Sequence, residues 1–192
     1  AVVVFGGVHP TALPDESLET GYVDIVVRHE GETAISELCE HILNGKVLDD
    51  IKGISYLKDG RPFHTPNRPP IDLSILPQFP YELFEKKMKA YSDFGLIVTS
   101  RGCPFDCIFC SNRLVTGRIY RAFSTDIVME QIDILINRYG QKSIYFADDT
   151  LVTDKKRFFA LLDAIIKKGF NKKAFFIAQM RADDMTEEVL EA

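Results

Sequence analysis

Three of the four cysteines stand close together in residues 101–110, where Cys103, Cys107 and Cys110 are spaced as C-x3-C-x2-C. They follow an apolar run, residues 96–98, that is typical of a buried strand. Thiolates in such a cluster are ligands for zinc or for an iron–sulfur cluster. A structural zinc site normally has four protein ligands in two separated pairs, and no second pair follows here. An iron–sulfur cube held by three thiolates leaves one iron open to a substrate or cosubstrate.

This spacing, with Phe109 just before the last cysteine, resembles that of the radical S-adenosylmethionine (SAM) superfamily. The resemblance implies that Cys103, Cys107 and Cys110 bind a [4Fe–4S] cluster, that the amino and carboxylate groups of SAM chelate the fourth iron, and that Phe109 lies near the adenine. An electron passed through the cluster would cleave SAM to methionine and a 5′-deoxyadenosyl radical. The alternatives are a structural zinc knuckle, an electron-transfer cluster with a fourth ligand elsewhere, and three unconnected thiols.

From residue 93 onward the pattern alternates between strands and helices. Strands are expected at 96–99, 143–146 and 174–178, with helices beginning near Ser124, Asp154 and Thr186. This alternation implies right-handed parallel crossovers, and function in such sheets collects at the carboxyl ends of the strands. One group of polar residues follows each expected strand: the cysteines after the first, Asp148 and Asp149 after the second, and Gln179 and Arg181 after the third. These residues are therefore expected to line one pocket.

The resemblance gives these residues specific roles. It implies that residues 93–192 are the first β/α units of a partial TIM-type (β/α)6 barrel. Many members of the superfamily carry a GGE motif after the second strand to hold the amino group of SAM, and Ala147-Asp148-Asp149 stands in that place here. Asp148 or Asp149 is therefore expected to contact SAM. Arg181 is expected to pair with the SAM carboxylate.

Residues 1–50 read as the end of a doubly wound, Rossmann-like or flavodoxin-like α/β domain. The apolar run 2–5 predicts a strand buried on both faces, followed by Gly6-Gly7 and a second strand at 24–28. A helix follows, with apolar Ile35, Leu38, Cys39 and Ile42 on one face, and it ends at Gly45. Cys39 is expected to be a small buried residue, and His9 a surface loop residue. This part resembles the last part of the cobalamin-binding domain found in one branch of radical SAM enzymes, which implies that Gly6 and Gly7 pass close to the nucleotide tail of the corrinoid.

Residues 51–92 separate these two parts. Asp59-Gly60, flanked by residues 53–57 and 61–64, predicts a β-hairpin, and the prolines at 66, 69, 70, 77 and 80 favour an extended connector. The expected organisation is therefore α/β throughout, with the end of a cobalamin-binding-like domain at 1–50, a hairpin and proline-rich linker at 51–92, and half of a radical SAM barrel at 93–192.

Composition limits the partners of the chain. It has 192 residues and a net charge of −5, without a stripe of Lys and Arg, which argues against nucleic acid. No apolar run approaches the ~20 residues of a membrane span, and reduced thiols fit a cytoplasmic protein. The resemblance implies a small-molecule substrate, an electron donor such as a flavodoxin or ferredoxin, and an outcome of methyl transfer or oxidative cyclisation with cobalamin as a further cofactor.

Overall fold

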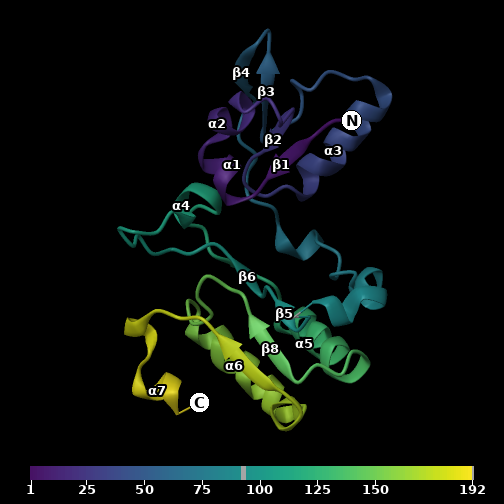
Figure 1. Ribbon diagram of the computed structural model, residues 1–192. Helices are drawn as coiled ribbons and strands as arrows, with labels where there is room; N and C mark the ends of the chain where they lie inside the picture. Colours follow the sequence, from purple (N-terminus) through teal and green to yellow (C-terminus); the bar gives the residue numbers. More distant parts are fainter. Residues whose placement is uncertain (92–93, 192) are drawn as a thin grey trace. The chain divides into compact units, whose positions relative to one another are not determined.

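A computed structural model describes residues 1–91 and 94–191 of the chain, in two compact units (Figure 1). The first unit comprises Ala1–Ile71 and Phe105–Arg118. The second comprises Asp72–Pro104 and Ile119–Ala192. None of the described helices has the length and apolar character needed to cross a membrane.

The first unit is built on a four-stranded sheet in the order β1-β2-β3-β4, in which β1 and β2 are parallel and the other pairs antiparallel. The strands are β1 (Val4–Gly6), β2 (Ile25–Val27), β3 (Ile54–Lys58) and β4 (Arg61–His64). The helices are α1 (Val8–Ala12), α2 (Pro14–Glu19), α3 (Glu32–Asn44) and the short α4 (Asn112–Val115).

The predicted hairpin is confirmed. Asp59 and Gly60 both have positive φ, 53° and 76°, as a two-residue type I′ turn requires. Strand β3 also pairs with β2, in the register Val26 to Ser55, so the hairpin continues the first sheet. Arg28 supports this junction by donating hydrogen bonds to the carbonyl oxygens of Ile54 and Thr65. Burial lowers the pKa of the Arg28 guanidinium from its ordinary value.

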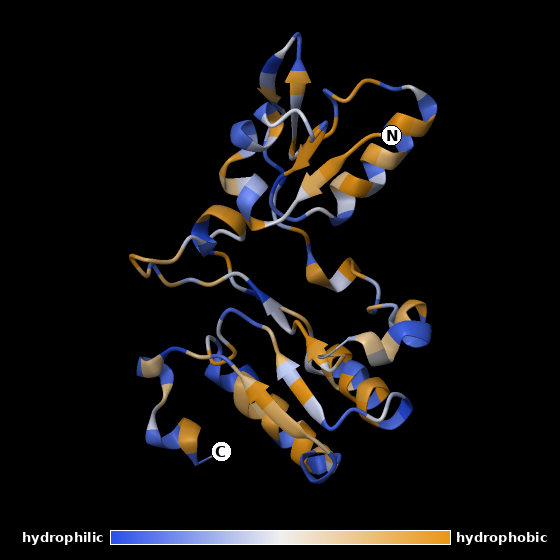
Figure 2. Cartoon of the chain, in the orientation of Figure 1, coloured by the Kyte–Doolittle hydropathy of each residue, from blue (hydrophilic) through white to orange (hydrophobic). Residues whose placement is uncertain are grey.

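The expectation that the first strand is buried on both faces was wrong. Val3, Val4 and Phe5 are 47%, 37% and 41% exposed, although β1 is among the apolar segments of the chain (Figure 2). Within the described sheet β1 lies at an edge and pairs only with β2. The strand that is buried on both faces is β2, whose three residues are all at most 3% exposed.

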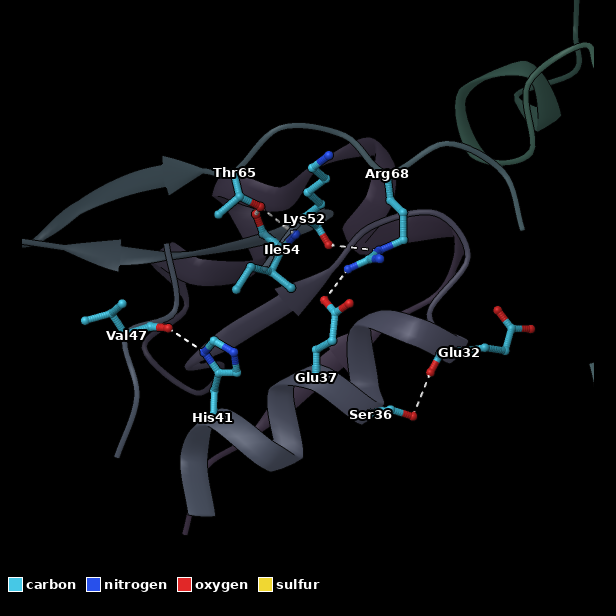
Figure 3. A network of polar contacts seen from close by, with 9 residues as sticks. All are labelled: Glu32, Ser36, Glu37, His41, Val47, Lys52, Ile54, Thr65 and Arg68. Atoms are coloured by element: carbon cyan, nitrogen blue, oxygen red, sulfur yellow. Dashed lines mark hydrogen bonds and ion pairs between the residues drawn. The ribbon is translucent and has the colours of Figure 1, made fainter. Parts of the chain in front are cut away.

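Helix α3 ends as predicted, at Gly45 in the left-handed conformation (φ 62°). Leu38 is buried as predicted, and Ala34 is buried with it, but Ile35, Ile42 and Cys39 are exposed. The prediction of a buried Cys39 was therefore wrong. The helix is fixed by a polar contact on its side, where Arg68 bridges Glu37 and the carbonyl oxygen of Lys52 (Figure 3).

The second unit contains a three-stranded parallel sheet in the order β5-β8-β9 and a two-stranded antiparallel ribbon, β6-β7. The strands are β5 (Leu96–Ile97), β6 (Ser100–Arg101), β7 (Arg121–Ala122), β8 (Ser143–Phe146) and β9 (Phe175–Ala178). The helices are α5 (Thr125–Asp133), α6 (Lys155–Lys167) and α7 (Glu187–Leu190), with a π-helical turn at Ile134–Arg138 and 3₁₀ turns at Leu73–Ile75, Tyr81–Ala90, Phe170–Lys172 and Ala182–Asp184.

The strand and helix alternation predicted for this unit is confirmed, and local signals explain the helix ends. The hydroxyl of Ser124 and the carboxylate of Asp154 accept backbone N–H groups at the starts of α5 and α6. Gly169, with φ 69°, terminates α6. The two helices pack on the sheet in one core, whose buried members include Ile97, Ile144, Phe146, Val128, Ile132, Leu135, Phe158, Leu161 and Ile165.

Candidate functional site

The predicted gathering of loops at one sheet edge is confirmed for the second unit. Strand β8 lies between β5 and β9 and is parallel to both, so the segments that follow the three strands leave the sheet at the same edge. The loops after β8 and β9 are joined there, since the N–H of Leu151 donates to the carbonyl oxygen of Gln179 at 3.1 Å.

The cysteine segment, here residues 102–120, starts from a two-stranded stem formed by β6 and β7. Residues Ser100 and Arg101 of β6 pair with Ala122 and Arg121 of β7, so the chain leaves and returns through a short antiparallel ribbon. Gly102, directly before Cys103, has a positive φ of 83°. A β-carbon at this position would lie 2.2 Å from the carbonyl oxygen of Ile119, so only glycine fits at the base of the segment.

The three cysteines lie on this segment, which is divided between the two units. Cys103 lies in the second unit, whereas Cys107 and Cys110 belong to the part assigned to the first. Cys103 and Cys107 are half-buried and Cys110 is exposed, and the N–H of Cys110 donates to the carbonyl oxygen of Cys107 at 3.0 Å. Across residues 1–91 and 94–191, no three His, Cys, Asp or Glu side chains come close enough to hold a metal ion.

The chemistry of the donors nevertheless fits an iron–sulfur cluster. All four cysteines lie among the described residues, and none is part of a disulfide. Three thiols within eight residues are soft ligands of the kind that iron–sulfur clusters use.

The two aspartates after β8 have different surroundings. Asp148 is 1% exposed, and its carboxylate accepts hydrogen bonds from the backbone and the hydroxyl groups of both Thr99 and Ser100. Asp149 is exposed at the same sheet edge. Sequence reasoning did not single out Thr99 or Ser100, although two hydroxyl residues at a strand end, just before Arg101-Gly102-Cys103, are a usable signal.

The other predicted residues of this site are accessible. Phe109 is 90% exposed, and Arg181, which is partly buried, pairs with Asp183. Neither arrangement tests a contact with SAM, so both contacts stay predictions.

The far side of the cysteine segment is held within the first unit. His29, in the left-handed conformation with φ 62°, forms a hydrogen bond from its Nδ1 to the carbonyl oxygen of Val115 at the end of α4. The backbone N–H of His29 donates to the hydroxyl of Thr11. His29 was missed from the sequence, because a positive φ at a non-glycine residue leaves no pattern there.

A carboxylate also forms ion pairs within this segment. Asp106, between two of the cysteines, accepts a hydrogen bond from Arg113 at 3.3 Å and pairs with Arg118 at 2.5 Å. These ion pairs are exposed, so each contributes little to stability.

Gly6 and Gly7 lie where β1 runs into α1. Gly7 has φ 111°, and a β-carbon there would meet no atom within 4 Å. Gly6 faces Val27 of β2, with 3.5 Å between a β-carbon and the Val27 carbonyl oxygen. His9, which was expected in a surface loop, is exposed but lies in α1, with its Nε2 atom 3.4 Å from Glu16.

Comparison with known proteins identifies the family to which the chain belongs. The model of the radical SAM superfamily matches residues 97–192, half of the chain, including all three clustered cysteines. The chain belongs to the radical SAM superfamily. Family membership agrees with the parallel β5-β8-β9 sheet and with a cysteine segment that starts beyond its first strand.

This radical SAM chain has longer relatives. It is 38% identical to an uncharacterized methyltransferase of Pyrococcus horikoshii, over 99% of the chain and 42% of that protein. It is 31% identical to an anaerobic magnesium-protoporphyrin IX monomethyl ester cyclase of Rubrivivax gelatinosus, over 87% of the chain and 32% of that protein. The chain thus spans about two fifths and one third of the lengths of these relatives.

A solved structure shares the fold. The radical SAM methyltransferase TsrM from Kitasatospora setae, solved with cobalamin and a [4Fe–4S] cluster bound, matches with a TM-score of 0.79. The identity is 18%, and the match covers all of this chain and 40% of that one. The chain therefore has an α/β fold like that of a cobalamin-dependent radical SAM enzyme.

Proposed function

We propose that the chain is the part of a radical SAM enzyme that binds a [4Fe–4S] cluster through Cys103, Cys107 and Cys110, and SAM beside it. The observation that carries this proposal is the position of the three thiols, which lie within the matched family segment and follow the carboxyl end of β5. The cluster, when bound, supplies the electron that cleaves the sulfonium C–S bond of SAM to give methionine and a 5′-deoxyadenosyl radical.

The chain's own residues would bind and orient SAM. The exposed ring of Phe109 is free to stack on the adenine, since a base and an aromatic ring attract through their faces. The exposed carboxylate of Asp149 suits the amino group of SAM better than Asp148, whose oxygens are already engaged. The guanidinium of Arg181 would exchange its pairing with Asp183 for the SAM carboxylate.

Cobalamin is the second cofactor that we propose. In this proposal β1, β2 and α3 form the end of a cobalamin-binding domain, residues 51–92 contain the hairpin and linker, and β5, β8 and β9 begin a partial β/α barrel. The open space around Gly7 would let the backbone approach the nucleotide tail of the corrinoid. The Pyrococcus relative and TsrM are described as methyltransferases and the Rubrivivax relative as a cyclase, which supports methyl transfer or oxidative cyclisation of a small molecule.

Reduction of the cluster requires a partner. We propose an electron donor such as a flavodoxin or ferredoxin, and a reducing, cytoplasmic location, because cluster ligands must remain thiolates.

Anaerobic reconstitution of the intact protein tests this function. With iron and sulfide, the wild type should take up about four irons per chain, and with SAM and dithionite it should release 5′-deoxyadenosine. Cys107→Ala should lose both properties, and Cys39→Ala, at an exposed cysteine outside the segment, should keep them. Stoichiometric zinc without a visible chromophore would instead support the structural zinc alternative.

A further inference from the structure

Thr99 and Ser100, where β5 gives way to β6, both donate hydrogen bonds to the carboxylate of Asp148, and we call these two residues the bend. The backbone N–H groups of Thr99 and Ser100 both donate to Oδ1 of Asp148, at 2.6 and 3.2 Å. In a regular strand successive N–H groups point in opposite directions. Two that converge on one oxygen form a concave anion-binding turn, here occupied by a side chain of the protein itself.

The second oxygen of the same carboxylate accepts two further hydrogen bonds, from side chains. Oδ2 of Asp148 accepts the hydroxyl groups of Thr99 and Ser100, at 2.5 and 2.8 Å. A carboxylate offers about four acceptor positions, and four donors from two residues are directed at this one. Thr99 is 0% and Ser100 3% exposed, so without Asp148 these donors would be buried with no acceptor in its place.

Arg157 of α6 holds the opposite side of the bend. The carbonyl oxygen of Thr99 accepts hydrogen bonds from the Arg157 guanidinium at 2.9 Å and from the N–H of Phe123 at 3.0 Å. Both polar backbone groups of Thr99 are therefore engaged: its N–H bonds to the loop after β8, and its carbonyl oxygen bonds to α6 and to the residue that follows β7.

The residues after this bend are constrained up to the first cysteine. Ser100 and Arg101 pair with β7, and Gly102 lies against Ile119. Cys103 is the next residue, so its backbone starts from a stem whose origin is fixed by Asp148.

We propose that Asp148 is a positioning residue: it fixes the bend at Thr99 and Ser100 from which Cys103 is presented, and it does not contact SAM. The role of Cys103 as a ligand rests on the proposed function. The dependence of the bend on Asp148 does not rest on the proposed function, because it is argued from hydrogen bonds within the protein.

Hydrogen exchange of the metal-free, intact protein tests the bend directly. In Asp148→Ala, the amides of Thr99 and Ser100 should exchange faster by on the order of tenfold or more, because each loses its acceptor. Amides of β9 should exchange as in the wild type. Asp163→Ala, which removes an exposed carboxylate from α6, should leave all of these rates unchanged. Unchanged exchange at Thr99 and Ser100 in Asp148→Ala, or equal acceleration in β9, would overturn the proposal.

A milder variant covers the case in which Asp148→Ala does not fold. Ser100→Ala removes one of the four donors and keeps the backbone N–H groups. It should accelerate exchange at Thr99 and Ser100 by several-fold with β9 unchanged. Unchanged exchange in this variant would count against the bend's dependence on the carboxylate.

Asp148→Asn separates positioning from a contact with SAM. Its amide oxygen can still accept the two N–H groups, and its NH₂ can donate to the two hydroxyl oxygens, which accept as well as donate. Iron content after reconstitution and SAM affinity should both stay close to those of the wild type. Normal iron content with SAM affinity lowered about tenfold would indicate a lost charge contact and overturn the proposal. If the wild type itself takes up no cluster, the proposed function fails while the exchange experiment still decides the role of Asp148.

Discussion

Gly102 lies so close to Ile119 that a β-carbon on Gly102 would be 2.2 Å from the Ile119 carbonyl oxygen. The same glycine has φ 83°, a conformation that other residues rarely adopt. The two sides of the cysteine segment therefore meet at a point that tolerates no side chain. A larger residue at position 102 would have to separate them.

Gly102→Ala should destabilise the protein more than Gly117→Ala does. Gly117, in the same segment, also has positive φ (68°), but a β-carbon there would meet no atom within 4 Å. Gly117→Ala should lower the free energy of unfolding by about 1 kcal/mol, from backbone strain alone. Gly102→Ala should add a clash worth about 1–3 kcal/mol. Urea denaturation of both variants measures the difference. Equal losses in the free energy of unfolding would show that Gly102 and Ile119 can move apart without destabilising the protein.

Asp154→Ala should weaken helix α6. The carboxylate of Asp154 accepts the N–H of Arg157 at 3.0 Å, and loss of such a cap typically costs about 1 kcal/mol. Asp163→Ala is the control, since Asp163 is an exposed acid in the middle of the same helix. Thermal denaturation should show a lower midpoint for Asp154→Ala only. Matching midpoints for the two variants would mean that the cap contributes nothing.

Tyr81 should make the protein sensitive to alkaline pH. Its ring is 5% exposed, and burial, with a smaller effect from Tyr139, raises the pKa of Tyr81 to about 12. The folded state holds this proton more tightly than the unfolded state, whose pKa is about 10. The contribution to stability is therefore complete below pH 10 and is lost as the pH rises from 10 to 12.

Tyr81→Phe should remove this part of the pH dependence. Free energies of unfolding measured between pH 9 and pH 12 should fall less steeply in the variant, by on the order of 2 kcal/mol over the interval. The aromatic contact with Phe79, whose ring centroid is 4.8 Å away, does not need the hydroxyl. An identical slope in variant and wild type would contradict the raised pKa.

Phe109→Ala should weaken SAM binding without changing stability. The ring is 90% exposed, so its removal costs the fold little, whereas loss of stacking on adenine is worth about 1–3 kcal/mol, or tenfold and more in affinity. Ile108→Ala removes a fully exposed neighbour and is the matched control. Calorimetric titration of the reconstituted protein with SAM compares the two. Equal affinities in both variants would exclude Phe109 from the SAM site.

The parallel strands of the second unit and the helices that follow them could be predicted from sequence because their signals are local, whereas the β6-β7 ribbon was not predicted. Each of these signals acts within one turn or one strand. Examples are the apolar run at residues 143–146, the helix N-cap at Asp154 and the helix-terminating Gly169. The same applies to the hairpin at Asp59-Gly60. The parallel direction of β5, β8 and β9 then follows because a helix connects each strand to the next by a right-handed crossover.

What could not be predicted depends on contacts between distant residues. Helical periodicity identified α3, but it did not reveal that Ala34 would be covered while Ile35 and Cys39 would remain exposed. Asp148 or Asp149 was expected to contact SAM, because Ala147-Asp148-Asp149 stands in the place of the GGE motif. The engagement of Asp148 by Thr99 depends on a residue 49 positions earlier in the sequence. The bond from His29 to Val115 spans 86 positions and likewise has no local signal.

The exposed apolar strands have a practical consequence for work with this chain alone. Phe175 and Ile177 of β9 are 80% and 50% exposed, and β9 has one neighbour in the described sheet. Unpaired backbone beside apolar side chains invites strand addition from other copies, which leads to aggregation. We expect the isolated chain to precipitate on concentration, and a charged side chain in place of Phe175 to raise its solubility.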